Sequence, residues 1–369
     1  MRRQIPFLDL ADFPADLKLE LQAKFSQMLD KGIFSGGEEV VGLENELKAY
    51  LKAPYFIACS NGTDALEIAL RALNIGQGDE VIVPAMTWVS TAEAVQLVAA
   101  TPVFAEIDAN GLLDLDKLPH YLSSKTKAII PVHLYGKMVD MKKLSALAKA
   151  NNLYLIEDAA QAFGACQHGI SAGLWGDIGC FSFYPTKNLG ALGEAGGLST
   201  NDSSLDRKIR LLINHGQEVR DTHEIVGRNA RIDTLQAGLL RVKLSYFDNW
   251  QKKRKALAKV YLEGLRGLTA IQFPNGILEE DHNAHLFVIQ TRKRDNLKMY
   301  LQSRGIGTAI HYPNPIPLMP AYSDESGKFP IAERISQTIL SLPLHPFLRV
   351  EDVEYICSEI KNFFDHRKT

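Results

Sequence analysis

The chain has 369 residues, 46% of them hydrophobic and 23% charged. This length and composition are typical of a globular protein with one large core and a smaller second domain, and they exclude a disordered or fibrous chain. Its 41 basic and 43 acidic residues give a formal net charge of -2. This balance excludes an overall positive potential that would attract nucleic acid, although a local basic pocket for a phosphate is still compatible with it. The four cysteines include no CxxC pair, which argues against a zinc site and a disulfide framework, so we expect reduced thiols and no metal.

The N-terminal segment MRRQIPFLDLADF carries two arginines, but Asp9 and Asp12 interrupt its apolar stretch at once. It is therefore not a signal peptide. No later apolar run approaches the roughly 20 residues that a membrane-spanning helix needs. We expect a cytoplasmic protein with no membrane partner.

Short apolar runs alternate with helical patterns between residues 60 and 215, and this alternation is typical of a sheet with helices on its faces. The predicted strands are 81–85, 102–108, 128–134, 153–159 and 179–184. The predicted crossover helices are 63–73, 90–100 and 141–152. The pattern predicts a three-layer α/β/α fold around a mainly parallel sheet.

A long amphipathic stretch, residues 236–265, follows this region and is too long for a crossover helix. It favours a helix that leads from one domain into the next, with a boundary near residue 248. Beyond it we expect a strand at 285–291, a helix at 298–307 ended by glycine, and a terminal helix at 351–364. The predicted division is a large domain, 1–248, and a small α+β domain, 249–369.

The most informative segment is FSFYPTKNLGALGEAGGLST, residues 181–200, where Lys187 follows a strand and precedes four glycines. The glycines allow backbone to pass close to a bulky group. A lysine that acts as a Schiff-base nucleophile must lose its proton near neutral pH, which requires burial or a neighbouring cation. Taken alone, such a lysine is more often a phosphate contact or a surface residue.

Upstream, LYLIEDAAQAFGA ends a predicted buried strand with Glu157 and Asp158, at the sheet edge where ligands bind in parallel α/β folds. A pyridinium nitrogen needs a carboxylate partner to stay protonated, and Asp158 is the candidate for that role. Gln161, three residues later, is placed to bond a ring hydroxyl. The alternative for Asp158 is a helix N-cap at a strand–helix junction.

The segment SNGTDALEIAL places Gly62 and Thr63 at a helix start, where free amides and the helix dipole favour an anion such as a cofactor phosphate. SNGTD is also simply a good turn and N-cap. Trp88 follows a strand, where its ring could stack on a flat heteroaromatic cofactor, although a tryptophan is more often a core or interface residue.

Two further loops hold candidate ligand contacts. Gly227 to Arg231, the sequence GRNAR, precedes a helix and suits a loop that reaches a phosphate or a partner subunit; a solvated loop is the alternative. In RGIGTAIHYPNPIPLMPAY, His311 and Tyr312 lie in a proline-rich, rigid loop of the kind that lines substrate pockets.

Taken in order, these segments resemble the DegT/DnrJ/EryC1/StrS family of pyridoxal-phosphate-dependent nucleotide-sugar aminotransferases, of fold type I. The resemblance covers about residues 7–347 and rests on several motifs: SNGTDAL, PVHLYG, EDAAQAFGA, FSFYPTKNLGALGEAGG, GRNARIDTLQA and GIGTAIHYP. The segment GEAGG, with Glu194 and Ala195, departs from the GDGG common in the family, which bears on fine substrate choice.

The resemblance implies that Lys187 holds pyridoxal 5'-phosphate (PLP) as a Schiff base and moves the catalytic proton. It implies that Asp158 pairs with the ring nitrogen, that Gln161 bonds the ring oxygen and that Trp88 stacks on the ring. The implied phosphate contacts are Gly62, Thr63, Ser182 and, from the other subunit of a homodimer with shared active sites, Asn229. The expected substrate contacts are Tyr184, Arg231, His311 and Tyr312.

The implied reaction moves an amino group from glutamate to a nucleotide-linked keto sugar. Tyr184, where many relatives have histidine, is similar to members that aminate a 3-keto-6-deoxyhexose on a thymidine diphosphate carrier. One rival is another PLP enzyme, such as a lyase, desulfurase or decarboxylase, because the same cofactor and fold support all of these. The other rival is a non-catalytic, regulatory relative; no DNA-binding appendage is visible in the basic residues.

Overall fold

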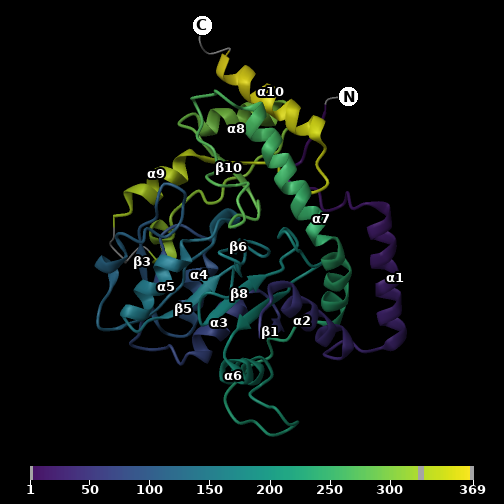
Figure 1. Cartoon of the computed structure of the whole chain (residues 1–369), viewed down its shortest axis with the longest axis vertical. Helices are drawn as coiled ribbons and strands as arrows, with labels where there is room; N and C mark the ends of the chain where they lie inside the picture. The colour runs from purple at the N-terminus through teal and green to yellow at the C-terminus, as the bar shows by residue number, and fades with distance from the viewer. Residues whose placement is uncertain (1–2, 323–327, 366–369) are drawn as a thin grey trace.

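The computed structural model describes residues 3–322 and 328–365, and its centre is a seven-stranded sheet (Figure 1). The strands in spatial order are β1 (Tyr55–Cys59), β9 (Gly196–Thr200), β8 (Ile178–Ser182), β5 (Tyr154–Asp158), β4 (Thr126–Ile129), β2 (Glu80–Pro84) and β3 (Thr101–Ala105). All five strands predicted between residues 60 and 215 are present in this sheet. β1 and β9 were not predicted.

Neighbouring strands from β8 to β3 are parallel, whereas β9 runs antiparallel to both β1 and β8. One strand, β9, is therefore reversed in an otherwise parallel sheet. In parallel strands the carboxyl ends meet at one edge, which is where ligands bind in open α/β sheets. The predicted α/β fold with a mainly parallel sheet is confirmed.

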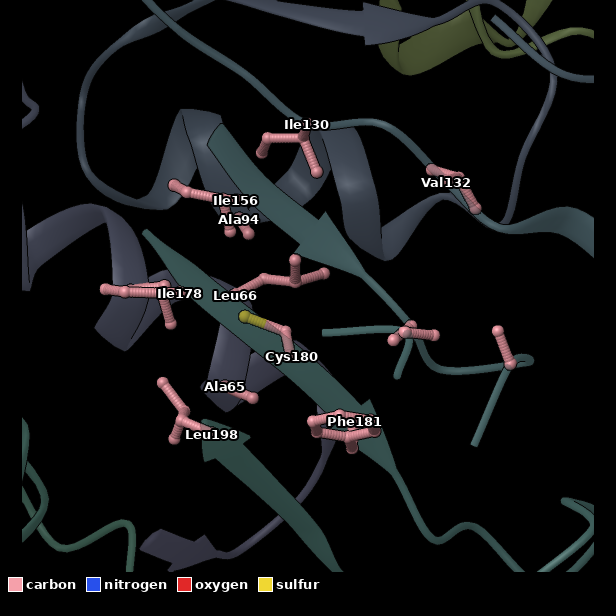
Figure 2. Close-up of a cluster of buried hydrophobic side chains, with 14 of the residues drawn as sticks. Ala65, Leu66, Ala94, Ile130, Val132, Ile156, Ile178, Cys180, Phe181 and Leu198 are labelled. Atoms are coloured by element: carbon pink, nitrogen blue, oxygen red, sulfur yellow. The ribbon is translucent and has the colours of Figure 1, made fainter. Parts of the chain in front are cut away.

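The crossover helices form as predicted and pack on the sheet through apolar side chains. They are α3 (Gly62–Ala72), α4 (Ser90–Leu97) and α5 (Met141–Ala150). Figure 2 shows part of this core, where Leu66 of α3 lies beside Ile156 of β5 and Cys180 of β8. Burial of such side chains contributes roughly 1.5–3 kcal/mol each, and the resulting rigid sheet positions the loops at its carboxyl edge.

A second core lies at the other end of the molecule, around the hairpin of β10 (Phe287–Gln290) and β11 (Ile339–Leu342). Helices α8 (Arg294–Ser303) and α10 (Val350–Asp365) cover it, with α9 (Pro330–Thr338) between β10 and β11 in the chain (Figure 1). The predicted helix at 298–307 begins earlier than expected, at Arg294, and Gly305 follows its end with a φ of 79°.

Helix α7 (Thr234–Gly264) connects the two cores as one continuous helix of 31 residues. It packs against α1 (Ala15–Lys31) and α2 (Glu38–Leu51), and against α10. The boundary predicted at residue 248 lies inside this helix. Ile5 is buried in the second core and pairs with Ile306, so the start of the chain packs with the C-terminal elements.

The remaining elements are α6 (Ser203–Ile213), the small hairpin of β6 (Cys166–Gln167) and β7 (Ile170–Ser171), and four short 3-10 helices at Leu118–Tyr121, Leu134–Gly136, Ile316–Leu318 and Pro320–Tyr322. Within residues 3–322 and 328–365, no helix combines the length and apolar character needed to cross a membrane. The same ranges contain no group of three or more His, Cys, Asp and Glu side chains arranged for a metal ion. All four cysteines are free.

Candidate active site

Lys187 lies in the loop that joins β8 to β9, five residues after Ser182 ends β8. The residue is half-buried, and desolvation of its amine lowers the pKa from 10.5 to about 8, although the charge of Asp158 acts in the opposite direction. The amine makes no hydrogen bond or ion pair with any residue that the structure describes. It is therefore a free nucleophile that is partly unprotonated near neutral pH.

Asp158 is the last residue of β5 and is only 6% exposed. Its carboxylate accepts hydrogen bonds from Thr91 Oγ1 at 2.9 Å and from the Ala160 amide at 3.2 Å. Burial raises the pKa of this carboxyl, and the bonds from Thr91 and Ala160 and the charge of Lys187 partly offset that rise. A protonated ring nitrogen would supply the cation that favours the ionised form.

The neighbouring carboxylate, Glu157, points to the other side of the sheet and has a structural role. It is fully buried and accepts backbone amides of Gly173, Trp175 and Gly176 at 2.6–2.9 Å. It also lies 2.9 Å from His133 Nε2. Because successive strand residues face opposite sides, only Asp158 faces the side on which Thr91 and Lys187 lie.

Three of the four residues predicted to hold a phosphate are brought together by a close approach of α3 to β8. Gly62 and Thr63 are the first two residues of α3, so their amides have no partner within the helix. A Cβ on Gly62 would lie 2.8 Å from Ser182 Cβ, so only glycine allows this contact. The Thr63 hydroxyl bonds Ser90 Oγ at 2.8 Å. The result is an amide-lined, hydroxyl-rimmed cradle that suits a phosphate.

Gln161, Trp88, Tyr312 and His311 meet beside Asp158. Trp88 is 57% exposed, and its ring centroid lies 5.7 Å from that of Tyr312. The Gln161 amide donates to the Tyr312 hydroxyl at 3.0 Å and keeps a second N–H for another acceptor. His311 is bonded through Nδ1 to Ser341 Oγ at 2.8 Å, and burial lowers its pKa to about 4, so the ring is neutral near pH 7.

Within the described part of one chain, the other three predicted residues contact different groups. Asn229 is exposed, and its backbone pairs with Asn214. Arg231 donates to Asn214 Oδ1 at 2.6 Å. Tyr184 is 45% exposed, and its backbone amide donates to Ser182 Oγ at 3.3 Å.

The glycines after Lys187 make room for backbone. A Cβ on Gly196 would lie 2.4 Å from the carbonyl carbon of Asn61, and one on Gly190 would lie 2.4 Å from the carbonyl oxygen of Pro185. The bulky group expected beside these two glycines is thus the protein backbone, at Asn61 and Pro185. Their role is to bring β9 against the start of α3 and to fold the Lys187 loop tightly.

Two residues were missed in the sequence. Thr91 holds Asp158, and Tyr135 joins both halves of the site because its amide donates to Gln161 Oε1 at 2.7 Å and its hydroxyl donates to the carbonyl of His311. Neither carries a local signal for such a role. A positive φ of 61° at Tyr135 becomes visible only in the structure.

The site that contains Lys187 does not coincide with a large cavity. A cavity of about 590 Å³ lies elsewhere, lined by Lys137, Cys166 and Glu279 among others, and none of the predicted residues lines it. Lys187 lines a cavity of only about 30 Å³. The site is identified by its chemistry.

Comparison with known proteins agrees with this geometry. The DegT/DnrJ/EryC1/StrS aminotransferase family matches residues 15–361. This chain belongs to that family. The predicted membership and the prediction of an aminotransferase are both confirmed.

Relatives within the family carry both enzymatic and regulatory names. The chain is 41% identical over 349 residues to dTDP-3-amino-3,4,6-trideoxy-alpha-D-glucose transaminase of Streptomyces venezuelae, covering 94% of this chain and 92% of that protein. It is 41% identical to UDP-N-acetyl-3-dehydro-alpha-D-glucosamine 3-aminotransferase of Acidithiobacillus ferrooxidans, covering 97% of both. It is also 40% identical to the erythromycin biosynthesis sensory transduction protein EryC1 of Saccharopolyspora erythraea, covering 97% and 99%.

Solved structures share the whole fold. The S. venezuelae protein DesV, solved in complex with a ketimine intermediate, has a TM-score of 0.94 at 40% identity and covers 98% of each chain. The Bacillus subtilis protein NtdA, solved with bound cofactor PMP, has a TM-score of 0.92 at 31% identity, over 97% of this chain and 85% of that one. PLP is thus the cofactor that this family and fold imply.

The residues of this chain fit that cofactor. The flat ring of the cofactor needs an exposed aromatic face, and its ring nitrogen needs a buried carboxylate. Its aldehyde needs an unprotonated amine, and its phosphate needs free amides. Trp88, Asp158 and Lys187 supply the first three, and the start of α3 beside Ser182 supplies the fourth.

Proposed function

We propose that this protein transfers an amino group from glutamate to a 3-keto-6-deoxy sugar on a nucleoside diphosphate, with thymidine diphosphate as the favoured carrier. The observation that carries the proposal is that the Lys187 amine, with its pKa lowered to about 8, feels the charge of the buried Asp158 carboxylate in an aminotransferase of this family. The names of the S. venezuelae and A. ferrooxidans relatives support amination at carbon 3 and differ in the nucleotide.

PLP, when bound, supplies an electron-withdrawing ring that stabilises negative charge on the substrate carbon. Asp158 would hold the proton on the ring nitrogen, and Thr91 fixes the orientation of its carboxylate. Gln161 has one N–H left to bond the ring oxygen, because its other polar contacts are taken by Tyr135 and Tyr312. Trp88 offers an exposed ring that would stack on the cofactor ring.

Lys187 Nζ is the group that moves the proton at the reacting carbon. With a pKa of about 8, roughly a tenth of the amine is unprotonated at pH 7, which is far more than for an exposed lysine. The neutral ring of His311 and the hydroxyl of Tyr312 come from the loop after α8, and Tyr312 lies beside Trp88, where these groups can bond sugar hydroxyls. We assign Tyr184 and Arg231 to the nucleotide-linked part of the substrate, Asn229 to the cofactor phosphate of the partner subunit in a homodimer, and the protein to the cytoplasm.

The test is an assay with PLP, glutamate and a matched pair of dTDP sugars that carry the keto group at carbon 3 or at carbon 4. We expect 2-oxoglutarate and a dTDP-3-amino sugar from the first and little product from the second. The UDP counterpart of the first sugar measures the preference for the nucleotide. A preference for the 4-keto sugar would contradict the assignment of the sugar.

The EryC1 relative, named for sensory transduction, makes a regulatory role the second candidate. The same assay separates the two. A regulatory protein would bind the nucleotide sugar without forming 2-oxoglutarate, whereas the intact Lys187 and Asp158 predict turnover.

A further inference from the structure

The GRNAR segment, residues 227–231, lies beside the entry to helix α3. The Ser60 amide, just before α3, donates to the Ala230 carbonyl at 2.9 Å. The Arg228 amide donates to the carbonyl of Leu212, near the end of α6, also at 2.9 Å. These two bonds hold the backbone of the segment between α6 and α3, and so they fix the position from which the Arg228 side chain extends.

The Arg228 side chain binds two carboxylates of α3. Its Nη2 donates to Asp64 Oδ1, and its Nη1 lies 3.2 Å from Glu67 Oε2. Asp64 also accepts a hydrogen bond from the Ser60 hydroxyl. Glu67 has a second cation, because Arg71 Nε lies 2.8 Å from its Oε1. Among the residues that the structure describes, Arg228 is the one cation within ion-pair distance of Asp64.

Asp64 is the third residue of α3 and shares its first turn with the Gly62 and Thr63 amides of the phosphate cradle. Helix residues rise by about 1.5 Å each, so the Asp64 backbone is only ~3 Å along the axis from Gly62, well within the screening length of about 8 Å. A helix N-terminus carries about +0.5 of an elementary charge, whereas a carboxylate carries about −1. Without a cation, this turn would be net negative and would repel a phosphate.

Arg228 changes the sign of the charge at this turn. Its guanidinium offsets the Asp64 carboxylate, which leaves the charge of about +0.5 that the helix dipole supplies. One turn later, Glu67 and Arg71 offset each other in the same way. The start of α3 can therefore attract an anion although it carries an acidic residue.

We propose that Arg228 is a positioning residue for the cofactor phosphate, because it offsets the charge of Asp64 and so allows the start of α3 to bind a dianion. The inference rests on PLP as the cofactor of the proposed function. Arg228 acts through Asp64 and not by touching the phosphate. Loss of Arg228 should therefore weaken phosphate binding, and removal of the Asp64 charge as well should restore it.

The test compares how the cofactor-free protein binds PLP and pyridoxal, which has the same ring and aldehyde but no phosphate. Absorbance titration gives a Kd for each compound. The variant Arg228→Met should raise the Kd of PLP by roughly 5- to 10-fold and that of pyridoxal by less than about 2-fold. The ratio of the two constants isolates the phosphate, so a general weakening of the fold cannot produce the same result.

Four further variants complete the test. The double variant Asp64→Asn/Arg228→Met should bring the Kd of PLP back to within about 2-fold of the wild-type value. Asp64→Asn alone should bind PLP at least as tightly as the wild type. Arg228→Lys keeps the positive charge and should keep most of the affinity. Arg220→Met, at an exposed position in the loop before the GRNAR segment, is the matched control and should bind PLP like the wild type.

The outcomes separate this inference from the proposed cofactor. An unchanged PLP constant in Arg228→Met, an equal loss for PLP and pyridoxal, or no recovery in the double variant would overturn the role of Arg228 and leave PLP as the cofactor. Weaker PLP binding in Asp64→Asn would also overturn it, whether or not Arg228→Met folds. Wild-type protein that binds pyridoxal as tightly as PLP would overturn both the phosphate cradle and the role of Arg228.

Discussion

The Gln161 side-chain amide lies 3.0 Å from the Tyr312 hydroxyl, which joins the segment after β5 to the loop after α8 across 151 residues of sequence. Tyr135 strengthens this connection by bonding Gln161 through its amide and the carbonyl of His311 through its hydroxyl. The two cores of the molecule therefore meet through a polar network at the site.

Replacing Tyr312 with phenylalanine tests this network. The change removes the acceptor for Gln161 and a polar group beside Trp88, so we expect KM for the keto sugar to rise by roughly 5- to 10-fold, equivalent to about 1 kcal/mol, with a smaller change in kcat. Tyr154→Phe, at the opposite end of β5, is the matched control and should leave both constants unchanged. An unchanged KM in Tyr312→Phe would remove Tyr312 from the substrate pocket.

Substitutions of the neighbouring residues Asp158 and Glu157 should have different effects, the first on catalysis and the second on stability. Asp158→Asn keeps the size of the side chain but loses the charge that faces the cofactor ring, so kcat should fall by roughly 10²-fold or more with little loss of stability. Glu157→Gln weakens a carboxylate that accepts three amides, so it should lower the free energy of unfolding by about 1–3 kcal/mol and leave kcat of the folded protein within a few-fold. The reverse pattern, measured by kinetics and urea unfolding, would exchange the roles of the two residues.

The rate at which the cofactor-free protein captures PLP should depend on pH through Lys187. Only the unprotonated amine attacks an aldehyde, so below the pKa of about 8 the rate should rise about tenfold per pH unit and level off above it. Stopped-flow absorbance measures this directly. A rate that keeps rising to about pH 10 would show that the amine has the pKa of an ordinary exposed lysine.

Asn229 tests whether the active site is shared between subunits. It is exposed in one chain, and the family resemblance places it at the phosphate of the partner's cofactor. The variants Lys187→Ala and Asn229→Ala should each have low activity alone. When equal amounts of the two are dissociated and reassembled together, half of the dimers are mixed, and each mixed dimer has one intact site out of two. The mixture should therefore regain up to about a quarter of wild-type activity. Failure of the mixture to exceed its two components would mean that each site is built from a single chain.

The sequence predicts the strands and crossover helices that carry strong local patterns, and it predicts Lys187 and Asp158 as a pair. It misses β9, whose sequence GGLST begins with two glycines, because these are required by contact with Asn61 and Phe56 and carry no strand signal. It also misses α1, since only a few well-separated apolar residues of that helix, among them Leu17 and Met28, are buried.

The missed site residues have a common physical reason. Thr91 reaches Asp158 across 67 residues of sequence, and Tyr135 acquires its role by contacting two segments at once. Such contacts depend on the packing of α4 and of the 3-10 helix at Leu134–Gly136 against the sheet. A local pattern of residues does not predict how distant segments pack together.

The most direct test of the central claim is to reduce the PLP-loaded protein with borohydride and locate the attached cofactor by peptide mass spectrometry. Lys243 is an internal control, because burial also lowers its pKa to about 8. We expect the cofactor mass on Lys187 and not on Lys243, and no incorporation when glutamate is added before reduction. Attachment to another lysine, or no attachment at all, would contradict the assignment of Lys187 and with it the proposed enzyme.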